Sequence, residues 1–158
     1  MNVTGLLVRK LLVYLAAVLT AYVLATAFAS LHVASNLASM GVETGFGGRL
    51  SMIAHDLAGM AGMFLPLIAL ALLIAFLVTA LLHYLVRRGQ VALYLLAGAA
   101  ALATLHLALH AAFGLTPVAA ARGAGGLLLQ ALAGAAGGAV YIALQRRLRL
   151  RVVEPDEA

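Results

Sequence analysis

The sequence predicts an all-α integral membrane protein, with four transmembrane helices, short loops and a helical lead-in before the second span. Hydrophobic residues make up 65% of the 158 residues and charged residues only 9%, whereas soluble domains usually carry about 25% charged residues. The apolar residues form four long runs, each close to the roughly 20 residues that a helix needs to cross a bilayer. Four spans use up most of the chain, so residues 1–158 are predicted to form a single membrane domain.

The first span is predicted from about residue 11 to residue 33, directly after Arg9 and Lys10. A basic start, an apolar stretch and the Ala-Phe-Ala sequence at 27–29 together fit a cleaved signal peptide. The apolar stretch is, however, longer than the roughly 7–15 residues of the core of a signal sequence. We therefore expect a retained transmembrane helix here, with cleavage as the alternative.

Residues 34–60 are predicted to form the outer loop, which holds a turn and a short helix. Gly45, Gly47 and Gly48 indicate the position of the turn. The segment 50–60 is then predicted to be the helical lead-in to the second span.

The three remaining spans are predicted at about 61–86, 91–113 and 123–144. Pro66 lies near the start of the second span, where it is expected to kink the helix or to separate the lead-in from the span. A tight basic turn joins the second span to the third. Residues 145–158 are expected to form an exposed, frayed tail on the cytoplasmic side.

The Lys and Arg residues beside the spans predict the orientation of the chain in the membrane. Arg49 and Arg122 fall on one side and eight basic residues fall on the other. The eight are Arg9, Lys10, Arg87, Arg88, Arg146, Arg147, Arg149 and Arg151. By the positive-inside rule the side with eight is cytoplasmic, so both termini are expected in the cytoplasm, and the membrane is expected to be a bacterial inner membrane. The six arginines after the second and fourth spans are also expected to anchor the chain to anionic lipid.

The fourth span carries a face of small residues, with Gly126, Gln130, Gly134 and Gly138 at four-residue spacing. Membrane helices associate through small residues, because these let the two backbones approach closely. Gln130 is expected to hydrogen-bond across a helix interface, since an unpaired amide is costly in hydrocarbon. The face is predicted to pack against the protein's own helices, and a seam to a second copy or to a partner is the alternative.

The first span carries a stripe of hydroxyl side chains, Tyr14, Tyr22, Thr26 and Ser30. Two interpretations of this stripe remain open. Either the hydroxyls point inward, to other helices or to a wet cavity, or Ser and Thr bond back to carbonyl groups of their own helix.

The predicted topology gathers polar side chains on the outer side of the membrane. His106 and His110 share a helix face, and His32, His55 and Asp56 fall at a similar depth. Two imidazoles one turn apart are able to share a Zn, Cu or Fe ion, whose ligand shell the other three side chains would complete. Haem held between His32 and the third span is a further alternative. The simpler interpretation is that these histidines are interfacial, since HxxxH here lacks the glutamate of a metalloprotease motif.

The sequence contains no recognisable enzyme motif. It has no cysteine, which excludes thiolate and Cys-ligated sites, and it has no phosphate loop, dinucleotide fingerprint, GxSxG or HExxH. The basic residues mark the ends of spans, so the lipid bilayer is the expected partner and nucleic acid is not.

We therefore expect a non-catalytic accessory, assembly or scaffold component that binds other membrane proteins or itself, as a homo-oligomer or within a larger complex. The sequence requires no cofactor. The first alternative is a metal- or haem-binding redox or metal-handling protein that uses the outer histidines. The second is a small oligomeric transporter or channel, with the hydroxyl stripe and Gln130 along its path.

Overall fold

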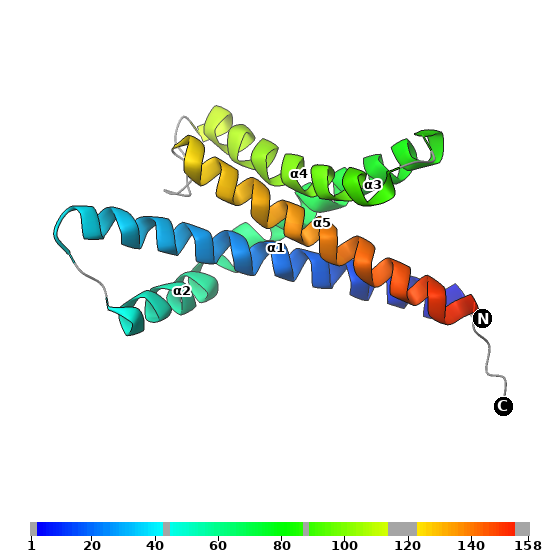
Figure 1. Cartoon of the computed structure of the whole chain (residues 1–158), viewed down its shortest axis with the longest axis horizontal. Coiled ribbons are helices and arrows are strands. Elements are labelled where there is room, and N and C mark those ends of the chain that lie inside the picture. The colour runs from blue at the N-terminus through cyan, green and yellow to red at the C-terminus, as the bar shows by residue number, and fades with distance from the viewer. Residues whose placement is uncertain (1–2, 43–44, 87–88, 114–122, 154–158) are drawn as a thin grey trace.

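The computed structural model describes residues 3–42, 45–86, 89–113 and 123–153 (Figure 1). Over this part of the chain the fold is all α, as predicted. Its five helices are α1 (Val3–Ser39), α2 (Phe46–Met60), α3 (Phe64–Val86), α4 (Gln90–Phe113) and α5 (Ala124–Val153). Four of them, α1, α3, α4 and α5, are long and apolar enough to cross a membrane.

The predicted lead-in is α2, which begins at Phe46 rather than at residue 50. Of the two expectations for Pro66, the structure shows the separation of two helices: α2 ends at Met60 and α3 begins at Phe64. Pro66 is the third residue of α3, where the backbone N–H groups have no partner within the helix, so a proline there removes no hydrogen bond. In the intervening turn the N–H of Met63 donates to the carbonyl of Met60 at 3.3 Å.

Gly41 ends α1, and of the glycines named from the sequence Gly45 lies between the two helices, as the N-cap residue of α2. Gly41 has a φ of 82°, and its N–H donates to the carbonyl of Ala38, while the N–H of Val42 donates to that of Leu37, both at 3.0 Å. This pair of bonds is a Schellman motif, in which a left-handed residue closes the end of a helix. Gly47 and Gly48 lie instead in the first turn of α2.

Two helices are longer than the predicted spans. The helix α1 continues beyond residue 33 to Ser39, where the Schellman motif ends it. The tail that was expected to be frayed is helical as far as Val153, because α5 continues through Arg and Leu residues, which favour helix. Pro155 follows two residues later in the sequence, and helices usually end at or before the residue that precedes a proline.

The helix α5 lies between α1 and α4 and runs antiparallel to both (Figure 1). At the α4–α5 crossing the two backbones touch, because a Cβ atom added to Gly98 or to Gly134 would overlap the carbonyl group of the other residue. Gly138 lies in the same way against the carbonyl of Tyr94. The absence of side chains thus sets the distance between these helices, which is how membrane helices commonly pack.

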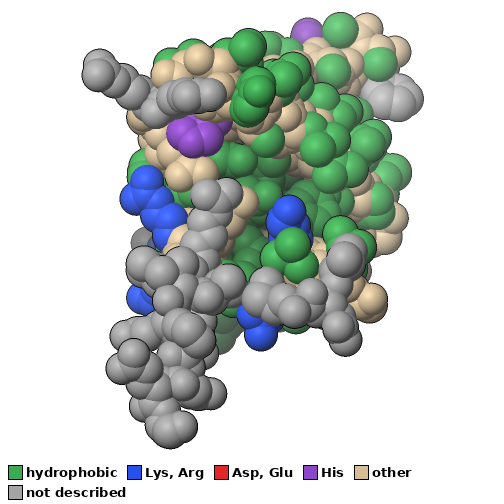
Figure 2. Space-filling view, turned by 90° about the vertical axis from the view of Figure 1, so that its right-hand side faces the viewer, with side chains coloured by type: hydrophobic (Ala, Val, Ile, Leu, Met, Phe, Trp, Pro, Cys, Tyr) green, Lys and Arg blue, Asp and Glu red, His purple; other side chains and the backbone are tan. Residues whose placement is uncertain are grey.

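The two ends of the bundle differ in charge and in shape. Figure 2 shows the end that holds both termini, where Arg9 and Lys10 of α1 and Arg146 and Arg147 of α5 are exposed. No Asp or Glu is in view among the side chains that are described. We call this the basic end. At the other end α1 and α2 extend further than α4 and α5 (Figure 1), and we call it the hairpin end.

Candidate functional site

The hydroxyl stripe of α1 fastens α2 and α3 to that helix. The hydroxyl of Tyr14 donates to the carbonyl of Ala69 on α3, and the hydroxyl of Tyr22 donates to the carbonyl of Leu57 on α2, both at 2.5 Å. Leu57 lies in the last turn of α2, so this bond attaches the end of that helix to α1. These two hydroxyl groups point inward, to neighbouring helices.

Ser30 meets both interpretations of the stripe at once. Its Oγ lies 2.7 Å from Oδ2 of Asp56 on α2, to which it donates, and 3.0 Å from the carbonyl oxygen of Thr26 on its own helix. Asp56 is half-buried at the hairpin end. The carboxylate therefore takes part in the attachment of α2 to α1.

His106 is the buried member of the predicted histidine cluster, with 2% of its surface exposed. Its Nδ1 lies 3.1 Å from the carbonyl oxygen of Leu102. Because a carbonyl only accepts, Nδ1 carries the proton and Nε2 is a bare acceptor. Nε2 is buried and has no hydrogen-bond partner among the described atoms. The edge of the ring packs on Phe64, with the ring centres 5.7 Å apart and the planes at 76°.

The other members of the predicted metal cluster are placed differently. His110 and His55 are exposed, His32 is half-buried, and Asp56 is bonded to Ser30. Among the residues that the structure describes, no three His, Asp or Glu side chains lie close enough to hold a metal ion together. The structure therefore does not bring the five predicted ligands into one group.

The small-residue face of α5 is occupied within the chain. Gly126, Gln130, Gly134 and Gly138 are all buried, and the amide Nε2 of Gln130 donates to the carbonyl of Ala25 on α1 at 2.9 Å. On α4, the residue that faces Gly134 of α5 is Gly98. The sequence reasoning did not assign Gly98 to the α4–α5 interface. Its signal was present, because Gly98 is the sole glycine between residues 91 and 113.

The arginines predicted to anchor the chain are described only in part. Arg146 and Arg147 are exposed at the basic end. Arg87 and Arg88 lie outside the described residues, and at Arg149 and Arg151 only the helical backbone is described.

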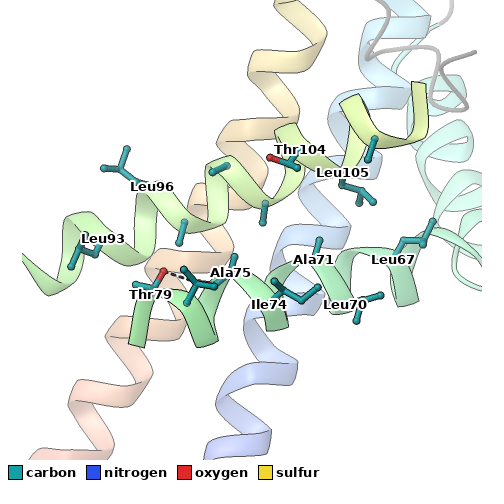
Figure 3. A pocket seen from close by; sticks show the side chains of 15 residues that line it. Leu67, Leu70, Ala71, Ile74, Ala75, Thr79, Leu93, Leu96, Thr104 and Leu105 are labelled. Carbon is teal, nitrogen blue, oxygen red and sulfur yellow. Dashed lines mark hydrogen bonds between the residues drawn. The ribbon is translucent and has the colours of Figure 1, made fainter. Parts of the chain in front are cut away.

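An apolar groove between α3 and α4 was not anticipated from the sequence. It has a volume of about 610 Å³ and is lined by residues 67–79 of α3 and 93–108 of α4. Figure 3 shows Ala71 and Ala75 beside it, with Leu70, Ile74 and Leu96 at its rim. Its hydroxyl groups come from Thr79, which donates to the carbonyl of Ala75 at 2.7 Å, and from Thr104. The sequence signal was the alanines at 71, 75, 97 and 101, which repeat at four-residue spacing on each helix.

No protein-family model matches the chain, and neither a curated protein nor a solved structure matches it. Its function is therefore inferred from its own residues.

Proposed function

We propose that the chain is a non-catalytic accessory, assembly or scaffold component of a membrane, which binds another membrane protein or a second copy of itself. The observation that carries this proposal is a group of exposed apolar side chains at the hairpin end, which we call the hairpin tip. Its members are Met40, Val42, Phe46 and Leu50, and all four are exposed.

The helix α1 is longer than the hydrocarbon layer is thick, and this places the hairpin tip outside that layer. From Leu11, which follows the basic pair Arg9 and Lys10, about 20 residues at 1.5 Å each cross a layer of about 30 Å and reach about Leu31. The rest of α1, as far as Ser39, then extends about 12 Å further. Side chains at this level face headgroups and water instead of lipid tails.

Large apolar side chains outside the hydrocarbon layer favour contact with another surface. Phe46 is 85% exposed and Met40 is 69% exposed. Phe46 and Leu50 lie one turn apart on α2 and so share a face. The Schellman motif at Gly41 fixes the position of Met40 and Val42 at the end of α1, and Phe46 and Leu50 lie on the first turns of α2.

The buried polar groups support a structural role for the bundle. Tyr14, Tyr22, Ser30 and Gln130 each donate a hydrogen bond to another helix. Their chemistry is engaged in assembly of the fold, as a scaffold requires.

We assign the hairpin tip to the outer side of a bacterial inner membrane, with both termini in the cytoplasm. The basic end supports this orientation, because cytoplasmic ends of spans carry an excess of Lys and Arg. The chain has no cysteine, so Phe46→Cys and Arg147→Cys each introduce a single thiol. A membrane-impermeant maleimide added to intact cells is expected to label Phe46→Cys and to spare Arg147→Cys. The opposite pattern would reverse the orientation.

Photo-crosslinking tests the proposed partner contact. Benzoylphenylalanine at Phe46 is expected to give a discrete adduct in living cells, identified by mass spectrometry as a membrane protein or as this chain. The matched control places the same probe at Leu77, which is exposed on the middle of α3, and is expected to give no discrete protein adduct. Protein adducts that are absent from Phe46, or equal at both sites, would refute the proposal.

A further inference from the structure

The groove between α3 and α4 has the length and lining of a slot for one hydrocarbon chain. Along α4 it runs from Leu93 to Ala108, which is about 22 Å at 1.5 Å per residue. This is longer than one leaflet of the hydrocarbon layer, which is about 15 Å thick. An acyl chain of a lipid in the leaflet at the basic end can therefore lie in the groove along its full length.

The lining favours a flexible chain over a second helix. Membrane helices pack closely where small residues form the outermost surface, but here the alanines lie below a rim of larger side chains. Leu70, Ile74 and Leu96 form that rim and are all more than half exposed. We expect these side chains to hold the backbone of another helix away from Ala75, whereas an acyl chain is much thinner than a helix of about 10 Å diameter.

Two polar side chains, those of His83 and Gln90, lie about one turn beyond the lining of the groove at the basic end. His83 lies one turn beyond Thr79 and so continues the face of α3 that lines the groove. The Nδ1 atom of His83 is buried and has no hydrogen-bond partner among the described atoms. Gln90, at the start of α4, lies one turn before Leu93. An apolar slot with an imidazole and an amide one turn beyond its end fits an amphiphile, with its headgroup at this end.

The charge of the basic end selects an anionic headgroup. Arg9, Lys10, Arg146 and Arg147 are exposed there, and among the described residues the one carboxylate, Asp56, belongs to the hairpin end. Basic side chains at the cytoplasmic level of transmembrane helices attract anionic lipid. The geometry points to a binding site for an anionic phospholipid, with one acyl chain in the α3–α4 groove and the headgroup beside His83 and Gln90.

Lipid quenching of a single tryptophan tests this site. The chain has no tryptophan, so Leu96→Trp places the sole indole at the rim of the groove. The protein is reconstituted in phosphatidylcholine bilayers that contain the same fraction of brominated phosphatidylglycerol or of brominated phosphatidylcholine. The quenching is expected to show that brominated phosphatidylglycerol binds with an affinity about fivefold higher, or more, than that of brominated phosphatidylcholine. About fivefold is the effect of one basic charge near the surface. Equal quenching by the two lipids would overturn the inference.

Two further variants, made on the Leu96→Trp background, separate the groove from the general surface charge. Ala75→Leu fills the groove and is expected to abolish the preference for phosphatidylglycerol. Ala80→Leu adds the same side chain to an exposed position of α3 outside the groove and is expected to keep it. His83→Leu leaves the apolar slot intact. It is expected to reduce the preference for phosphatidylglycerol while quenching by brominated phosphatidylcholine remains. This variant provides the test if Ala75→Leu does not fold.

Two outcomes would overturn the lipid site. A preference that survives both Ala75→Leu and His83→Leu would show that the groove does not hold the lipid. Absence of quenching by either brominated lipid, together with disulfide-linked dimers of Leu96→Cys, would show that a second copy of the chain covers the groove.

Discussion

Replacement of Gly134 by alanine is expected to force α4 and α5 apart. Gly134 and Gly98 face each other, and a Cβ atom on either would overlap the carbonyl group of the other. The obstacle is backbone, which does not swing aside as the end of a flexible side chain does. The helices must therefore separate along a contact that also includes Gly138 and the carbonyl of Tyr94.

The expected cost follows from two opposing effects. Alanine in place of glycine favours a helix by up to about 1 kcal/mol, but overpacking of a well-packed interior costs about 1–3 kcal/mol. The Cβ atom at Gly134 would overlap only backbone atoms, those of Gly98 and Ala99 on α4, so we expect the upper part of that range and a net loss of about 2 kcal/mol. Gly137 provides an intermediate case, because its Cβ would lie 2.9 Å from the carbonyl oxygen of Ala17, half an ångström short of ordinary contact.

The free energy of unfolding is measured by titration of the purified protein with SDS in mixed micelles, followed by far-UV circular dichroism. Gly125→Ala is the matched control, since Gly125 lies on the same helix and has no atom within 4 Å of an added Cβ. The expected order of stability is Gly125→Ala, then Gly137→Ala, then Gly134→Ala. If Gly134→Ala and Gly125→Ala agree within about 0.5 kcal/mol, which is the usual spread of surface substitutions, the close approach of these helices is refuted.

A double variant makes the same test independent of helix propensity. Once one Cβ atom has moved the helices apart, the second meets less resistance. Gly98→Ala/Gly134→Ala is therefore expected to cost less than the sum of the two single variants, with an interaction energy above about 0.5 kcal/mol. Strict additivity would mean that the two glycines do not share a contact.

Four other substitutions, at three positions, have expected effects on the same free energy of unfolding, and amide exchange and metal analysis add two further tests. Gln130→Leu is expected to cost at most about 1 kcal/mol, since interhelical hydrogen bonds in membranes contribute little. Gln130→Ala is expected to cost about 2 kcal/mol because it leaves a cavity. A larger loss of stability in Gln130→Leu than in Gln130→Ala would contradict this. Tyr22→Phe removes the hydrogen bond that attaches the end of α2 to α1 and is expected to raise amide exchange there, with a loss of about 1 kcal/mol; unchanged exchange would argue against the bond. His106→Phe keeps a ring packed edge-on against Phe64 and removes an unpartnered acceptor, so it is expected to be neutral or stabilising by up to about 1 kcal/mol. Metal analysis is expected to show equal content in the wild type and in His106→Ala/His110→Ala; stoichiometric metal that the double variant loses would return the histidines to a metal site.

The fold class was predictable because the signals that define it are local. Four apolar runs and their basic flanks require no knowledge of tertiary contacts. The ends of helices were less accurate, and the reasons are specific. Gly41 closes α1 through two hydrogen bonds that depend on its left-handed conformation, and α5 continues past the first charged residues of the tail as far as Val153. Polarity alone therefore placed the helix ends too early.

The candidate sites were less predictable, because periodicity places a residue on a face but does not identify the neighbour of that face. The spacing of His106 and His110 suggested a shared ligand, yet one ring is buried against Phe64 and the other is exposed. Gly98 and Gly134 each had a visible signal, but their contact depends on the register between two helices. The α3–α4 groove depends on the angle between those helices, which no local pattern specifies.

The two ends of the bundle are held together by different interactions, and this bears on where the protein can move. Towards the basic end, Phe76, Tyr94 and Tyr141 form a cluster with ring centres 4.5–5.5 Å apart, next to the glycine contact of α4 and α5. At the hairpin end α2 has no buried residue, and the hydrogen bonds from Tyr22 and Ser30 attach it to α1. Segments with few buried apolar contacts open at a lower free energy than the core. The helix that carries Phe46 is thus the element most able to adjust to a partner while the rest of the bundle stays closed.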